Sequence, residues 1–288
     1  MTTIMPPRLR ASPWGRLART LRFCKMSAAG NDFVLLERKE AAKSSLAPGR
    51  LARLLCDRRH GIGADGLLLV DTGHVVPRLS YYNCDGSTAF CGNGTRSAAL
   101  WLHRQGFTRG AGSFTFRSAA GPVQARVSPR GGTAAVRMPD PRDLRLDISL
   151  SLLGRRTTVH AVNTGVPHAV IVAPDVERLA VAEAGRALRR HPAFAPSGTN
   201  ADFVSVGRKE LFLRTYERGV EDETLACGTG AVAAAVVAHA LGLVRPPVRV
   251  RIRGGAVLKV DFRLQGPSYA EVWLEGPARI VFTGEMKP

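Results

Sequence analysis

A short motif occurs twice in this chain of 288 residues, and it constrains the fold more than any other feature. The first copy reads Cys-Gly-Asn-Gly from Cys91, and the second reads Cys-Gly-Thr-Gly from Cys227. An alanine-rich apolar run follows each copy and predicts a buried helix. Glycines let the backbone approach a ligand closely, and the unpaired N–H groups of a helix start favour an anion. We interpret the copies as a matched pair of sites, each with a thiolate-prone cysteine.

The sequence around this motif predicts two similar halves. Helices are expected over residues 48–56, 95–105 and 180–190, and short alternating strands with Gly and Pro punctuation fill much of the remainder. Asn31-Asp32-Phe33-Val34 resembles Ala201-Asp202-Phe203-Val204. The first stretch lies 59 residues before its cysteine and the second 25, counted from each aspartate. This difference predicts an insertion in the first half that includes the glycine loop 61–66.

We therefore expect an α+β fold of two pseudo-symmetric halves, each a mostly antiparallel sheet wrapped around a central Ala-rich helix. The predicted segments are a basic, disordered extension over residues 1–20, an N-terminal half over 21–137 and a C-terminal half over 138–273. A final strand within 274–288 is expected to return to the first half. The extension has four arginines and no acidic residue, so a targeting segment and a start codon assigned too early are alternatives to simple disorder.

Composition narrows the class of protein. The net charge of +18 raises the hypothesis of nucleic-acid binding, but the arginines are mostly spread singly and aromatic residues make up only 6%. We interpret the charge as compositional bias that also attracts acidic substrates, and expect no nucleic-acid partner. Five cysteines without a Cys-x-x-Cys pair argue against a disulfide framework and a zinc knuckle. The odd number and scattered spacing of the cysteines make a reducing cytoplasm the expected compartment. The apolar run from Ala231 to Val244 is too short to span a membrane, so we expect no membrane partner.

Two cysteines that face one carbon atom from opposite sides permit a particular reaction. A thiolate can remove the Cα proton of an amino acid while a thiol returns a proton to the other face, which inverts the stereocentre. Helix starts aimed at the α-carboxylate would stabilise the negative charge that develops there. No lysine lies in a motif typical of a pyridoxal Schiff base, so we expect no cofactor and no metal.

Several further motifs accompany the two cysteines. They are Lys25-Met26, Gly30-Asn31-Asp32-Phe33, Asp57-Arg58, Gly61–Gly66, Asn83-Cys84-Asp85-Gly86-Ser87, Asn163-Thr164-Gly165, Pro167-His168, Glu217-Arg218-Gly219 and Glu223–Gly230. With them the chain, from about Lys25 onward, resembles the diaminopimelate epimerase family. The resemblance implies a cofactor-independent isomerase that interconverts LL- and meso-diaminopimelate in lysine and peptidoglycan-precursor biosynthesis. It also implies a homodimer.

The resemblance assigns roles to individual residues. Cys91 and Cys227 would be the acid–base pair, and His168 and Glu217 would adjust their pKa values. The expected substrate-binding residues contribute side chains or backbone N–H groups, and they are Asn31, Asn83, Gly92, Asn93, Asn200, Glu217, Arg218, Gly228 and Thr229. Asp65 and Asp85, in glycine turns, are interpreted as turn formers. Cys24, Cys56 and Cys84 are interpreted as packing residues.

Three positions depart from the family pattern: Ser27, where many members have His, Val166, where many have Asn, and Gly66, where some have Gln. They leave recognition of the distal end of the substrate open. A related two-cysteine racemase, such as a histidine racemase, is therefore an alternative. More distant alternatives are a basic RNA-binding protein on an inactive enzyme fold and a zinc site that uses Cys84 and Cys91.

Overall fold

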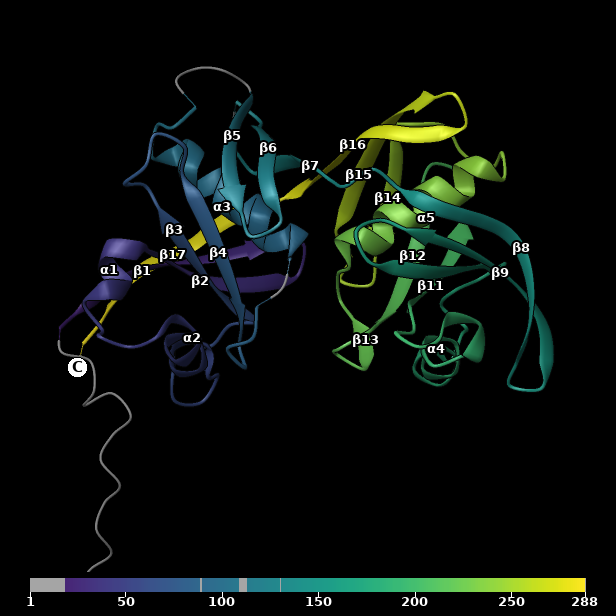
Figure 1. The fold of residues 1–288 in the computed structure, drawn as a ribbon, viewed down its shortest axis with the longest axis horizontal. Helices are drawn as coiled ribbons and strands as arrows, with labels where there is room; N and C mark the ends of the chain where they lie inside the picture. Colours follow the sequence, from purple (N-terminus) through teal and green to yellow (C-terminus); the bar gives the residue numbers. More distant parts are fainter. Residues whose placement is uncertain (1–18, 89, 109–112, 130, 288) are drawn as a thin grey trace, which may run out of the picture.

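The computed structural model describes residues 19–88, 90–108, 113–129 and 131–287. Its strands form one hydrogen-bonded network that is divided between two lobes (Figure 1). The predicted α+β class with two similar halves is confirmed. The predicted extension over residues 1–20 lies almost entirely outside the described residues. In the part of the chain that the structure describes, no helix is long and apolar enough to cross a membrane.

In the first lobe, sheet strands surround one long helix. Its elements are β1 (Leu21–Ala28), β2 (Asn31–Glu37), α1 (Arg38–Ala42), α2 (Pro48–Cys56), β3 (Gly66–Asp71), β4 (Arg78–Asn83), α3 (Gly92–Arg104), β5 (Ser113–Ser118), β6 (Gly121–Val127) and β7 (Thr133–Arg137). Strands β1 and β2 are antiparallel, β3 runs parallel to β2, and β4 runs antiparallel to β3. Helix α3 packs against β1, at the start of this half, and against β6 and β7, at its end.

The second lobe repeats this plan around α5. Its elements are β8 (Arg142–Leu152), β9 (Arg155–Asn163), β10 (Pro167–Val172), α4 (Val181–Arg189), a 3-10 turn (Pro192–Phe194), β11 (Asn200–Val206), β12 (Leu211–Glu217), β13 (Asp222–Thr224), α5 (Gly228–Ala240), β14 (Val248–Ile252), β15 (Val257–Gln265) and β16 (Ser268–Pro277). Strands β9 and β10 are antiparallel, β11 runs parallel to β10, and β12 runs antiparallel to β11.

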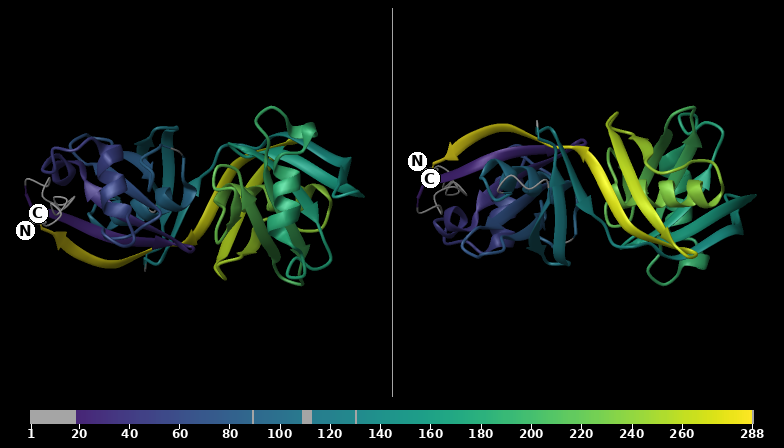
Figure 2. Two further views of the ribbon diagram at one scale, coloured as in Figure 1. Left: turned by 90° about the horizontal axis from the view of Figure 1, so that it is seen from below. Right: turned by 90° about the horizontal axis from the view of Figure 1, so that it is seen from above.

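Two crossings join the lobes. Strand β7 leads into β8, and β16 runs back to β17 (Arg279–Met286), as both views in Figure 2 show. Strand β16 pairs with β7, and β17 pairs with β1 in the first lobe. The last strand of the chain therefore completes the sheet that the first strand begins.

The strand order corrects the predicted alignment of the repeat. Parallel pairing sets Phe33 of β2 opposite Gly66 of β3, and Ala169 of β10 opposite Ala201 of β11. Gly66 is therefore the counterpart of Ala201, and the two lie 25 and 26 residues before the cysteines of their halves. The loop 61–66 has a counterpart before β11, so the predicted insertion is wrong. The shared Asp-Phe-Val sequence had aligned β2 with β11, although β11 is the counterpart of β3. Buried strands share similar apolar residues, so such a short match does not fix their place in the sheet.

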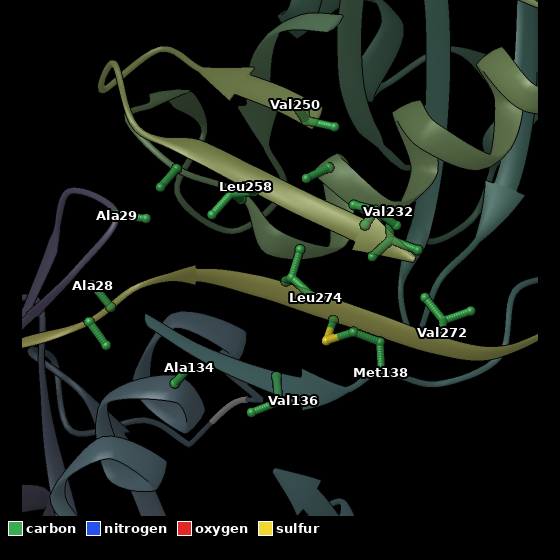
Figure 3. Packing of buried hydrophobic residues seen from close by; sticks show 14 of the residues in the cluster. Ala28, Ala29, Ala134, Val136, Met138, Val232, Val250, Leu258, Val272 and Leu274 are labelled. Carbon is green, nitrogen blue, oxygen red and sulfur yellow. The ribbon is translucent and has the colours of Figure 1, made fainter. Parts of the chain in front are cut away.

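Helix α5 is buried on every side. Its residues from Ala231 to Ala238 have no exposed surface, which is the expected position for a helix that is apolar all round. Helix α3 begins directly after Cys91, earlier than the predicted residue 95, whereas α2 matches its prediction and α1 was not predicted. Figure 3 shows Leu274 of β16 and Met138 within the core where the two lobes meet.

Candidate active site

Cys91 and Cys227, referred to below as the helix-start cysteines, occupy equivalent positions. Each is the N-cap of its central helix, and each sulfur accepts a backbone N–H bond, from Gly94 at 3.4 Å and from Gly230 at 3.3 Å. An N-cap is normally an oxygen-bearing side chain that pairs with such an N–H. Sulfur takes that role here, where the helix dipole favours the anionic thiolate.

The two helix starts meet over one side chain of β16. A Cβ atom built on Gly92 would lie 3.8 Å from Leu274 Cδ2, and one built on Gly228 would lie 2.9 Å from the same atom. A Cβ at Gly228 would also lie 3.8 Å from Asn93 Oδ1 on the other helix. Glycine at position 228 therefore allows the start of α5 to approach Leu274, which Figure 3 shows at the junction of the lobes, whereas a side chain at position 92 would only touch it.

Burial raises the pKa of both thiols. The pKa of Cys91 reaches about 11, because burial outweighs the Gly94 N–H bond and the negative charge of Glu217 acts in the same direction as burial. Burial likewise raises the pKa of Cys227 well above its usual value, and the charges of Glu217 and Asp202 add to this effect. The same carboxylate thus acts on both cysteines. This links residues from the two halves in one electrostatic site.

Glu217 is the last residue of β12, which pairs with the short strand β13. Its carboxylate accepts a hydrogen bond from Thr224 Oγ1 at 2.5 Å. Burial raises the pKa of Glu217, against the Thr224 hydrogen bond and the nearby His168. Glu217 therefore lies where the sequence expects a residue that adjusts the cysteine pKa values.

His168, on β10, belongs to a fully buried polar cluster beside Cys227. Its Nδ1 lies 2.6 Å from Asp202 Oδ2, and Asp202 Oδ1 accepts from Thr215 Oγ1 at 2.7 Å. The His168 and Asp202 side chains have no exposed surface. A Cβ at Gly230 would lie 2.7 Å from Asp202 Oδ1 and 3.2 Å from the Cys227 sulfur. The cluster therefore packs against the start of α5.

Sequence reasoning used Asp202 only as a marker of the repeat and missed this contact. In the sequence, Asp202 stands out as the one charged residue of β11, which is otherwise uncharged. Its partner on β10 is 34 residues away in the chain. A buried carboxylate in a central strand requires a partner, and this requirement was the available signal.

The expected substrate-binding residues lie at or next to strand ends and at the starts of the two central helices, in both halves. Asn200 accepts the backbone N–H of Arg218 at 2.8 Å through Oδ1 and donates through Nδ2 to the Pro167 carbonyl at 3.1 Å. The Arg218 side chain reaches the Ser197 carbonyl at 3.4 Å. Asn83 accepts from the Tyr81 hydroxyl at 2.8 Å. These residues are held in place by protein groups before any ligand binds.

The first half holds its polar residues in a longer network. Asn31 Nδ2 donates to Asp65 Oδ2 at 2.9 Å, and Asp65 Oδ1 pairs with Arg58 at 2.7 Å. A Cβ at Gly30, next to Asn31, would lie 3.5 Å from the Leu225 Cβ in the loop before Cys227. The β1–β2 turn thus contacts the second half. Asp65 is more than a turn former, because its carboxylate accepts from Asn31, a predicted substrate-binding residue. Asp85 accepts hydrogen bonds from Ser87 within its own turn, as expected of a turn former.

The structure gives a steric reason for glycine at position 66. A Cβ there would lie 2.4 Å from Tyr81 Cε2 and 2.7 Å from the Tyr82 carbonyl oxygen. The Tyr81 ring thus occupies the space that a larger residue 66 would need. Val166 is half-buried, and its carbonyl accepts the Thr164 N–H at 3.1 Å.

The remaining cysteines are separate from this site. Cys24 and Cys56 are buried, and burial raises their pKa values to about 11 and about 12. Cys84 is exposed, unlike the buried packing residue that the sequence predicted. Within the described ranges, no group of three or more His, Cys, Asp or Glu side chains is arranged to hold a metal ion.

Comparisons with known proteins agree on one family. The sequence model of diaminopimelate epimerase matches residues 23–143 and 160–281. The diaminopimelate epimerase of Aquifex aeolicus is 37% identical over 278 residues, which cover 92% of this chain and 98% of the relative. That of Chlorobaculum tepidum is 37% identical over 265 residues, which cover 90% and 98%.

Solved structures share the fold at low sequence identity. A PhzF-family phenazine biosynthesis protein from Bacillus anthracis superposes with a TM-score of 0.69 at 14% identity, covering 93% of this chain and 99% of that one. A hydroxyproline epimerase from Agrobacterium vitis superposes with a TM-score of 0.67 at 16% identity, covering 94% of each chain. Together with the sequence matches over nearly the whole length, these findings show that the chain belongs to the diaminopimelate epimerase family.

Proposed function

We propose that this protein is an isomerase that interconverts LL- and meso-2,6-diaminopimelate without a cofactor, in lysine and peptidoglycan-precursor biosynthesis. The observation that carries the proposal is the equivalent placement of the helix-start cysteines, each the N-cap of its central helix, where burial first and the charge of Glu217 second raise the pKa of both thiols. Curated relatives named diaminopimelate epimerase support the choice of substrate.

In the proposed reaction, one cysteine acts as a thiolate and the other as a thiol. The thiolate removes the Cα proton, the thiol delivers its proton to the opposite face, and the roles exchange in the reverse direction. The backbone N–H groups of Gly92, Asn93, Gly228 and Thr229 stabilise the negative charge that grows on the α-carboxylate.

Burial raises the pKa of both thiols, and the negative charge of Glu217 adds to this effect. In the proposed reaction, the thiolate is favoured by a cation near Glu217. The α-ammonium group of the substrate provides it. The substrate carboxylates and the distal amine would be held by Asn31, Asn83, Asn200 and Arg218. His168 would adjust the pKa of Cys227.

Exchange of the substrate Cα proton with solvent deuterium tests the proposal. Incubation of LL-diaminopimelate in D2O should yield meso product with one deuterium at the inverted carbon, and a bell-shaped pH profile should accompany it. Cys91→Ala and Cys227→Ala should each abolish epimerisation. Turnover that survives complete alkylation of the thiols would contradict the mechanism.

The main alternative is a two-cysteine racemase that acts on a different amino acid, because Gly66 and Val166 leave recognition of the distal end of the substrate open. Preferential racemisation of a monocarboxylate amino acid such as histidine would replace diaminopimelate as the substrate while keeping the two-cysteine chemistry. We also propose a cytoplasmic homodimer that binds neither nucleic acid nor membrane. Sedimentation analysis tests the dimer, and salt-dependent retention of RNA would contradict the absence of nucleic-acid binding.

A further inference from the structure

A buried guanidinium lies behind the start of α3. Arg96 has no exposed surface, and its only hydrogen bond among the described residues runs from Nη2 to Asn93 Oδ1 at 2.7 Å. Its Nε and Nη1 atoms have no partner within that part of the chain. Burial of a cation without a carboxylate partner is strongly unfavourable. Packing does not require a cation either, because Val232 stands at the equivalent position, five residues after Cys227.

Arg96 begins a hydrogen-bond relay whose direction is fixed at both ends. A guanidinium can only donate, so Asn93 must turn its Oδ1 toward Arg96 and its Nδ2 toward Asn31. Asn31 Oδ1 accepts that bond, and Asn31 Nδ2 then donates to Asp65 Oδ2 at 2.9 Å. An ionised carboxylate can only accept. Arg58 holds this carboxylate in place at 2.7 Å.

We propose that Arg96 and Asp65 are positioning residues that fix the amide direction of Asn31, so that its second N–H faces a carboxylate of the substrate. That N–H has no partner among the described residues. Without Arg96, the Asn93 amide can turn its oxygen toward the Asn31 oxygen, and the resulting repulsion would displace the Asn31 side chain, although Asp65 still accepts from its Nδ2. The inference rests on the proposed function, because it assigns a task to a predicted substrate ligand.

Steady-state kinetics of single and double variants test this role. Arg96→Met should lower kcat/KM by about 100-fold, which is the size of effect that a displaced binding group produces. Arg96→Lys should restore most of the loss, because an ammonium group also donates to Asn93 Oδ1. Ser97→Ala is the matched control, since it removes a neighbouring buried and unpaired polar atom outside the relay, and its kcat/KM should stay within about twofold of wild type.

The double variant asks whether Arg96 acts through Asn31. If it does, Arg96→Met combined with Asn31→Ala should be no worse than Asn31→Ala alone. Independent, multiplying losses would overturn the proposal. The Tm of Arg96→Met should equal or exceed that of wild type, since an unpaired buried charge is removed. A fall of more than about 5 °C would indicate a packing role and would also overturn it.

Hydrogen exchange of selectively 15N-labelled asparagine separates this inference from the proposed function. In wild type, the side-chain amides of Asn93 and Asn31 should exchange slowly, and this protection should be lost in Arg96→Met. Protection together with no turnover of diaminopimelate would refute the proposed function and leave the relay intact. Amides that exchange equally fast in both proteins would refute the relay whatever the substrate.

Discussion

Asp202 offers the sharpest test of how the second half supports its cysteine. Replacing it with alanine leaves two buried polar groups without partners: His168 Nδ1, now 2.6 Å from the carboxylate, and the Thr215 hydroxyl, now 2.7 Å from it. Each unsatisfied buried group costs about 1–3 kcal/mol. We therefore expect Asp202→Ala to lower the free energy of unfolding by about 2–6 kcal/mol. Asp202→Asn, which keeps an acceptor for His168, should lose about half as much.

Urea denaturation measures this loss as a lower midpoint with an unchanged slope. Asp85→Ala is the matched control, because among the described residues the Asp85 carboxylate accepts hydrogen bonds only from Ser87 in its own exposed turn, and it should change stability by less than about 1 kcal/mol. Asp202→Ala should also make Cys227 more reactive to iodoacetamide, because the negative charge of Asp202 contributes to the raised pKa of Cys227. A loss below about 1 kcal/mol for Asp202→Ala would refute the assigned role of this cluster.

Three further predictions follow from separate contacts. Gly66→Ala should destabilise the protein by about 1–3 kcal/mol, because its Cβ would lie 2.4 Å from Tyr81 Cε2; urea denaturation measures this, and wild-type stability would contradict it. Glu217→Gln should lower the pKa of both helix-start cysteines by removing a negative charge. Mass spectrometry should then find faster alkylation of both at a fixed neutral pH, and a rate change at one cysteine alone would contradict the shared carboxylate. Burial would raise the pKa of Asp32, but Arg58 and a neighbouring lysine outweigh it and lower that pKa to about 2. Asp32 therefore contributes about 2 kcal/mol above pH 4 that is lost as the pH falls toward 2, and Asp32→Asn should flatten acid unfolding over this range.

Chemistry that depends on neighbouring residues could be predicted from the sequence. Two glycines and an apolar run after Cys91 and Cys227 indicate a helix start wherever the rest of the chain lies, because backbone bending and helix periodicity are local properties. Helix α2 matched its prediction for the same reason. The motifs around Glu217 and His168 identified the family through residues that lie within a few positions of one another.

Alignment of the two halves could not be predicted in this way. Asp32 and Asp202 precede the same pair of residue types, yet Asp32 lies on β2 and Asp202 on β11, which is the counterpart of β3. Short buried strands carry too few distinctive residues to fix their place in a sheet. Hydrogen-bond register decided it.

The sequence by itself determined the duplicated helix starts, their cysteines and the two-half architecture. Only the tertiary structure decided what those cysteines face: one Glu217 acting on both thiols, Asp202 paired with His168, and Arg96 linked through Asn93 to Asn31, 62 residues away in the chain from Asn93. The physical reason is that a buried polar atom must find its partner in space. That partner comes from whichever strand or helix packs beside it, at a sequence separation that no local pattern records.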